Sequence, residues 1–200
     1  MIYVIDTGYA GTHIDVVTST SSDDIGHGTA MVEYIKDYNK NANITSIQLP
    51  TLTPSSCELI QLVESLIEKV AADDIVLFTW VIKRDSCFDL VVSRLALCCV
   101  VVCAAGNYSS SISEYSPCSV IGVRTITALN KSGTLAQFSN YGQGTIPMFG
   151  TNVTSSSEQQ YTGTSVAAAI YTALITRNSS PRFFRRAFKL LSRKFANELL

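Results

Sequence analysis

The chain has 200 residues, of which 46% are apolar and 16% charged, and its formal net charge at pH 7 is −1. These proportions are typical of one globular domain and exclude a disordered polymer. No apolar run reaches the roughly 18 residues that a membrane-spanning helix needs. The first residues also lack the basic region of a signal peptide, so an intracellular protein is favoured unless targeting segments lie outside this sequence.

Six cysteines would allow three disulfides, but their positions argue against pairing. Cys98, Cys99 and Cys103 lie in or beside one apolar run, where they resemble small core side chains. Their spacing also matches no zinc-binding pattern. We therefore expect reduced thiols in a reducing compartment.

Short apolar runs alternate along the chain with amphipathic segments of helical length. Strands are expected at residues 2–5, 44–49, 75–80, 100–105 and 120–128. Helices are expected at residues 28–38, 55–72 and 88–97. Because several of these strands are apolar on both faces, the alternation predicts a mostly parallel sheet with helices on both faces. Residues 1–176 would then form one three-layer α/β domain.

Four short motifs follow one another at the ends of these elements. They are Asp6-Thr7-Gly8, Gly26-His27-Gly28-Thr29, Ala104-Ala105-Gly106-Asn107 and Gly163-Thr164-Ser165-Val166-Ala167. Each motif alone also fits an ordinary strand end, turn or helix start. Together they are harder to explain in this way, because open α/β sheets form their sites beyond the carboxyl ends of the strands, where Asp6 and Asn107 both fall.

In this order, the motifs resemble those of the subtilisin-like serine proteases, whose acid, base and nucleophile run Asp, His, Ser along the chain. Residues 115–123, 138–142 and 148–150 resemble further segments of the same family. The resemblance spans about residues 2–176. It implies a subtilisin-like fold and serine endopeptidase activity on protein or peptide substrates, without a cofactor.

The resemblance also implies a role for each matching residue. Ser165 would be the nucleophile, His27 the general base, and Asp6 the group that orients the imidazole. The Asn107 side chain and the Ser165 backbone N–H would form the oxyanion hole. Two segments would line the substrate pocket, and their residues are Thr79, Trp80, Val81, Ala104, Ala105 and Gly106.

Some positions depart from the family pattern. Val81 and Ile82 stand where the family usually has glycine, which predicts a pocket entrance that is narrower or differently shaped and a processing protease of limited specificity. Only 21 positions separate Asp6 from His27, so we expect the loops that build calcium sites in secreted members to be absent. We therefore expect no metal site, although Asp15 could be the remnant of a calcium ligand.

The last part of the chain, residues 177–200, differs in charge from the rest. It holds seven of the 15 basic residues and one of the 16 acidic ones, so it carries +6 and the remainder −7. Its apolar residues recur at helical spacing and are Phe184, Phe188, Leu191, Phe195 and Leu199. This pattern predicts a basic amphipathic helix. It would pack on the acidic domain, or contact an anionic membrane, a nucleic acid or a larger assembly.

Other functions explain fewer of the motifs. An aspartic protease built around Asp6-Thr7-Gly8 leaves His27, Asn107 and Ser165 without a role. The related Ser-Glu-Asp peptidases fit poorly, because a histidine stands at the base position and an asparagine at the oxyanion position. The main alternative is a catalytically degenerate subtilase-fold module for binding or structure. Only the enzyme would be acylated at Ser165.

Overall fold

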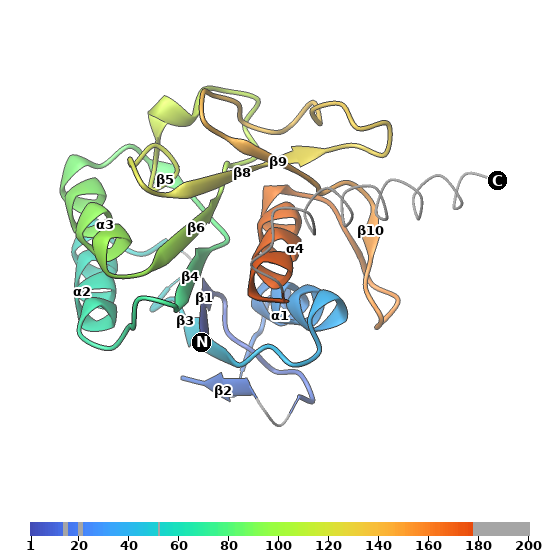
Figure 1. The fold of residues 1–200 in the computed structure, drawn as a ribbon, viewed down its shortest axis with the longest axis horizontal. Helices are drawn as coiled ribbons and strands as arrows, with labels where there is room; N and C mark the ends of the chain where they lie inside the picture. Colours follow the sequence, from blue (N-terminus) through green and yellow to red (C-terminus); the bar gives the residue numbers. More distant parts are fainter. Residues whose placement is uncertain (14–15, 20–21, 52, 178–200) are drawn as a thin grey trace.

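A seven-stranded sheet forms the centre of the computed structural model, which describes residues 1–13, 16–19, 22–51 and 53–177 (Figure 1). The strand order is β2-β3-β1-β4-β6-β8-β9, and every pair is parallel. The strands are β1 (Ile2–Asp6), β2 (Val16–Thr18), β3 (Ile44–Gln48), β4 (Ile75–Phe78), β6 (Val100–Ala104), β8 (Arg124–Leu129) and β9 (Ile146–Phe149). From β1, the chain first builds the sheet toward β2 and then turns to the other side through β4. The carboxyl ends of β1 and β4 therefore mark a topological switch point.

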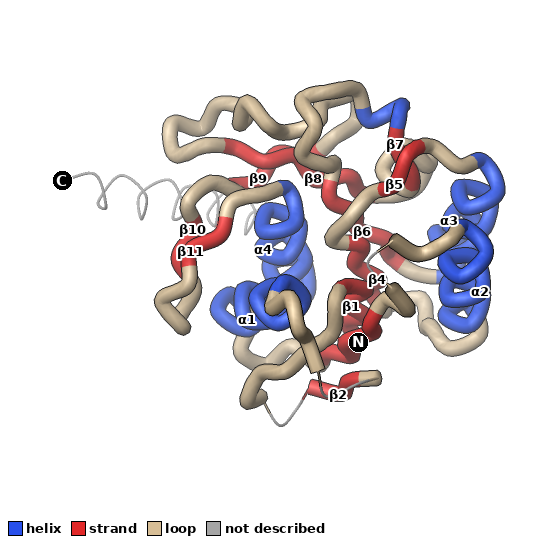
Figure 2. Tube along the Cα trace, turned by 180° about the vertical axis from the view of Figure 1, so that it is seen from behind, coloured by secondary structure: helices blue, strands red, loops and turns tan. Residues whose placement is uncertain are grey.

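Helices cover both faces of this sheet (Figures 1 and 2). Helices α1 (His27–Tyr38) and α4 (Thr164–Arg177) pack together on one face, and α2 (Ser56–Ile67) and α3 (Ser86–Cys98) pack together on the other. Neighbouring strand residues divide between the two cores: Val4 belongs to the α1–α4 core and Ile5 to the α2–α3 core. This alternation follows from the pleat of a strand, which turns successive side chains to opposite faces. The predicted three-layer α/β architecture is confirmed.

Smaller elements tie the loops to this framework. The short strands β5 (Ile82–Lys83) and β7 (Tyr115–Ser116) pair antiparallel, as do β10 (Val153–Thr154) and β11 (Gln160–Tyr161). A 3₁₀ turn, Ile112–Glu114, precedes β7. The buried Tyr34 of α1 holds the β10–β11 pair, because its hydroxyl donates to the Val153 carbonyl at 2.6 Å and accepts from the Tyr161 N–H at 3.2 Å.

The strand expected at residues 120–128 begins later than predicted. Residues 120–123 form a turn in which the Val123 N–H donates to the Val120 carbonyl at 3.2 Å. Gly122 has a φ of +93°, a left-handed conformation that ends an extended run. Periodicity alone missed this turn because its side chains are as apolar as those of the strand.

The helix expected at residues 55–72 has the predicted start and a different end. The Ser55 side chain caps it, accepting from the Glu58 N–H while the Glu58 carboxylate accepts from the Ser55 N–H. The helix stops at Ile67, and in the turn that follows it the Lys69 and Val70 N–H groups both donate to the Leu66 carbonyl. The other predicted elements differ from the observed ones by one or two residues at their ends.

Three further observations bear on the sequence predictions. No helix within the described residues is long and apolar enough to cross a membrane. All six cysteines, which lie among the described residues, are free thiols. Of the basic helix predicted for residues 177–200, only Arg177 is described, as the last residue of α4, and residues 178–200 lie outside the described residues.

Candidate active site

Four segments distant in sequence meet at the carboxyl edge of the sheet. Strand β1 ends at Asp6, and β6 leads into the loop that carries Asn107. Helix α1 begins at His27, and Ser165 is the second residue of α4. Asp6, His27 and Ser165 therefore stand at the ends of rigid elements, and Asn107 follows the end of β6, all at the carboxyl edge of the sheet.

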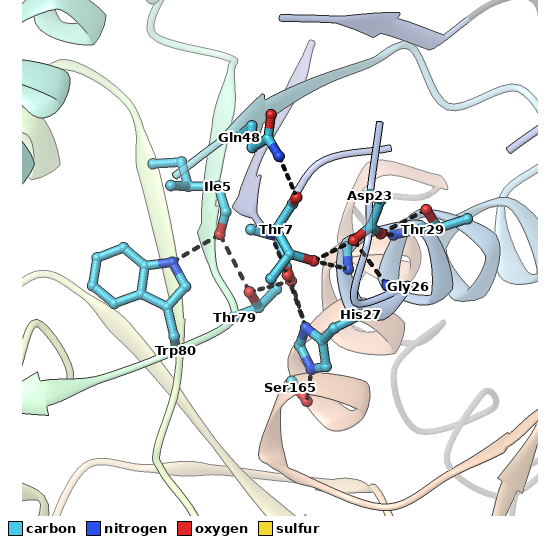
Figure 3. Close-up of polar contacts among 12 residues, drawn as sticks. Ile5, Thr7, Asp23, Gly26, His27, Thr29, Gln48, Thr79, Trp80 and Ser165 are labelled. Atoms are coloured by element: carbon cyan, nitrogen blue, oxygen red, sulfur yellow. Dashed lines mark hydrogen bonds and ion pairs between the residues drawn. The ribbon is translucent and has the colours of Figure 1, made fainter. Parts of the chain in front are cut away.

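The structure brings Asp6, His27 and Ser165 into one line of hydrogen bonds. Figure 3 shows the His27 ring directed toward Ser165. The Nδ1 atom of His27 lies 2.8 and 2.9 Å from the two carboxylate oxygens of Asp6. Its Nε2 atom lies 3.2 Å from the Ser165 hydroxyl oxygen. Because an ionised carboxylate only accepts hydrogen bonds, Nδ1 carries the proton and Nε2 presents a lone pair to the serine. This is the geometry in which an imidazole can take a proton from a hydroxyl.

Asp6 is held firmly in its place. Its side chain is buried and accepts hydrogen bonds from the Thr7 N–H at 2.6 Å and from the Thr79 hydroxyl. Burial by itself lowers the pKa of His27, but the hydrogen bond and charge of Asp6, with the charge of Asp23, raise that pKa above its ordinary value. Asp6 and Asp23 therefore stabilise the protonated form of His27.

Asp23 contributes to the electrostatics of the site, and the sequence prediction did not include it. It fixes the start of α1: one carboxylate oxygen accepts from the Gly26 N–H and the Thr7 hydroxyl, and the other from the N–H and hydroxyl of Thr29. Burial raises the pKa of Asp23, and these hydrogen bonds outweigh it and hold the pKa below its ordinary value. The available signal was an acidic residue shortly before a helix start, although the N-cap position itself is Gly26.

The Asn107 amide is oriented by the first residue of α4. Its Oδ1 atom accepts from both the N–H and the hydroxyl of Thr164, each at 2.9 Å. Nδ2 is therefore the end turned toward the serine. A methyl group placed on Gly163 would lie 3.2 Å from Ser165 Oγ, 3.3 Å from Asn107 Nδ2 and 3.8 Å from the Ser165 backbone nitrogen. The hydroxyl and two N–H donors thus surround one small space above Gly163.

The predicted substrate segments lie beside this space, but not all their side chains face it. The Thr79 hydroxyl donates to Asp6 and to the Ile5 carbonyl, and Trp80 Nε1 donates to the same carbonyl at 2.9 Å (Figure 3). The Trp80 ring stacks on Phe88 of α3 at a centroid distance of 6.1 Å.

The second segment is closely packed. Ala104 and Ala105 are buried. Val81 lies against Gly106, because a methyl on Gly106 would come within 2.9 Å of Val81 Cγ2. The described residues contain no group of three or more His, Cys, Asp or Glu side chains placed to hold a metal ion, and Asp15 lies outside them.

Comparison with known proteins identifies the family of this chain. A model of the Subtilase family matches residues 64–181, more than half of the chain, and the chain belongs to that family. The fold matches the crystal structure of a cold-adapted subtilisin-like serine proteinase with a TM-score of 0.80. The match covers 88% of this chain and 75% of that chain at 21% identity. The predicted family and the subtilisin-like fold are confirmed. The family match begins after Asp6 and His27 and therefore does not include them.

Proposed function

We propose that this chain is a serine endopeptidase in which Asp6, His27 and Ser165 form the catalytic triad. One observation carries the proposal: a continuous hydrogen-bonded line joins a buried carboxylate, an imidazole and a hydroxyl. The serine lies 138 positions from the histidine, so this line is a product of the tertiary fold rather than of local sequence. Membership of the Subtilase family supports a peptidase over other uses of the same chemistry.

The reaction would proceed through an acyl-enzyme. Ser165 Oγ attacks the carbonyl carbon of the scissile peptide bond while His27 Nε2 takes the hydroxyl proton. The tetrahedral intermediate collapses as the imidazolium passes that proton to the leaving amine and the C–N bond breaks. Water then attacks the ester with His27 again as base, releasing the carboxylic acid and the serine. Throughout, Asp6 holds Nδ1–H and stabilises the imidazolium.

The developing negative charge on the carbonyl oxygen needs fixed donors. The space above Gly163 supports this role for Asn107 Nδ2 and the Ser165 backbone N–H, because both border it together with the nucleophile. The same space lies at the amino end of α4, a helix of 14 residues whose dipole favours negative charge there. The donors are in place before the reaction, so little reorganisation opposes it.

The substrate would be a protein or an extended peptide. We propose that residues 79–81 and 104–106 bind the part before the cut. The packing of Val81 against Gly106 supports a narrow pocket and therefore a processing protease of limited specificity. Since the side chains of Thr79 and Trp80 point to β1, contacts from that segment would come from its backbone and from Val81.

A fluorophosphonate probe tests the function directly. The purified protein is treated with the probe, and the mass of the intact chain is measured. We expect one adduct on the wild-type chain and none on Ser165→Ala. Ser46→Ala is a matched control that removes another buried serine hydroxyl, and it should react like the wild type.

Cleavage of an unfolded protein substrate by the same preparation would then establish endopeptidase action. A folded wild-type chain that takes no adduct would contradict the proposal. In that case the alternative of a catalytically degenerate subtilase-fold module, used for binding or structure, would remain.

A further inference from the structure

Asn140 is a fully buried polar residue whose side-chain amide and backbone N–H all bond to one loop. It follows β8 in the chain and is 0% exposed. Its Nδ2 donates to the Ala105 carbonyl at 2.9 Å, and its Oδ1 accepts from the N–H groups of Tyr108 and Ser110 at 2.9 and 3.2 Å. Its own backbone N–H donates to the Gly106 carbonyl at 2.9 Å. These four hydrogen bonds hold the chain on both sides of Asn107.

The loop depends on these hydrogen bonds because its backbone is irregular. Gly106 has a φ of +98° and Ser109 a φ of +54°, both in the left-handed region. Glycine adopts such a φ readily, but in serine it is uncommon and persists only where the surroundings determine it. The fit is also close, since a methyl on Gly106 would lie 2.5 Å from Asn140 Nδ2. Asn140 therefore sets the path of the backbone from which Asn107 projects.

The Asn107 side chain is held separately. Its amide oxygen is bound by Thr164, whose hydroxyl also accepts from the Gly106 N–H at 3.1 Å. Asn107 thus has two supports: Thr164 orients the amide, and Asn140 positions the backbone beneath it. The described contacts of Asn140 include none with Asp6, His27 or Ser165, so its effect on those residues is indirect.

We propose that Asn140 is a positioning residue of the oxyanion hole: it holds residues 105–110 so that Asn107 Nδ2 meets the carbonyl oxygen of the substrate. The inference rests on the proposed protease function and extends it to a residue outside the triad. An oxyanion donor must lie within about 2.7–3.1 Å of the charged oxygen, so a small shift of the loop removes much of its effect. A misplacement of about 1 Å can cost on the order of 10²-fold in rate.

Steady-state hydrolysis of a peptide ester or amide by Asn140→Ala provides the first test. We expect kcat to fall roughly 10- to 100-fold while KM changes by less than about threefold, because the donor acts mainly in the transition state. Asn140→Asp keeps an oxygen acceptor for the two N–H groups but replaces the Nδ2 donor with an oxygen that faces the Ala105 carbonyl, so kcat should fall in this variant too. The matched control is Asn130→Ala, which removes a similar set of asparagine bonds within the turn of residues 130–134 and should leave kcat unchanged.

A double-mutant cycle separates positioning from a general loss of order. If Asn140 acts through Asn107, then Asn140→Ala should cost less than about threefold in kcat when Asn107 is already alanine. An equal loss in both backgrounds would overturn the inference, and so would a folded Asn140→Ala enzyme with unchanged kcat. Should the alanine variant fail to fold, Asn140→Asp carries the same cycle. A wild-type chain that fails to react with the fluorophosphonate contradicts the function and this inference together, whereas an active enzyme with an additive cycle contradicts only the inference.

Discussion

Gly163→Ala places one methyl group where the carbonyl oxygen of the substrate is proposed to bind. The three nearest atoms to that methyl would be Ser165 Oγ at 3.2 Å, Asn107 Nδ2 at 3.3 Å and the Ser165 nitrogen at 3.8 Å. Carbon atoms pack best at about 3.5–4.0 Å, and an oxyanion lies about 2.7–3.1 Å from its donors. The methyl and the oxyanion therefore cannot share the space.

The expected loss of activity follows from the donors that become inaccessible. Removal of one oxyanion-hole donor from a subtilisin costs roughly 10²–10³ in kcat, and this serves as the lower limit here because the methyl borders both proposed donors. The fold should tolerate the change. Gly163 does not have a left-handed φ, and two of the three close contacts are with side-chain atoms. We expect the free energy of unfolding to change by no more than about 1 kcal/mol.

The assay combines urea unfolding with the rate of fluorophosphonate labelling and of peptide hydrolysis. Gly133→Ala is the control: it adds a methyl with no neighbour within 4 Å at a left-handed position, so it strains the backbone without touching the site. Gly163→Ala should unfold like the wild type and react at least about 10²-fold more slowly. A folded Gly163→Ala protein with the wild-type rate would refute the assignment of this space.

Two other predictions concern charge and buried hydrogen bonds. The labelling rate should rise with pH through a midpoint above the ordinary histidine value of about 6.5, because the base must be neutral and the pKa of His27 is raised; Asp23→Asn should move that midpoint downward, which a pH–rate profile measures. The contribution of His27 to stability is accordingly present below its unfolded-state pKa and is lost as pH rises through the raised folded-state pKa. An Asp23→Asn variant whose pH–rate midpoint equals that of the wild type would contradict the electrostatic reasoning. Tyr34→Phe leaves the Val153 carbonyl and Tyr161 N–H without this hydroxyl and should cost about 1–3 kcal/mol in the free energy of unfolding by urea, with little change in labelling rate if the β10–β11 pair serves stability alone.

The sequence by itself determined the fold class, the family and the set of residues to examine. The architecture was predictable because side-chain periodicity and apolar runs are local properties that depend on neighbouring residues. Asp6, His27, Asn107 and Ser165 could be selected because each lies in a short motif at the end of an element, where a parallel sheet gathers its loops. The end of α2 was missed, because the turn after Ile67 is made by backbone bonds that side-chain pattern does not record.

Only the tertiary structure decided how the site is supported. Thr164 binds the Asn107 amide across 57 positions, and Asn140 binds the Tyr108 N–H across 32. Which end of an amide turns toward the nucleophile, or whether Trp80 faces substrate or core, depends on partners that come together only when the chain is folded. Hydrogen bonds act over a few ångströms of space, and sequence patterns record only distance along the chain.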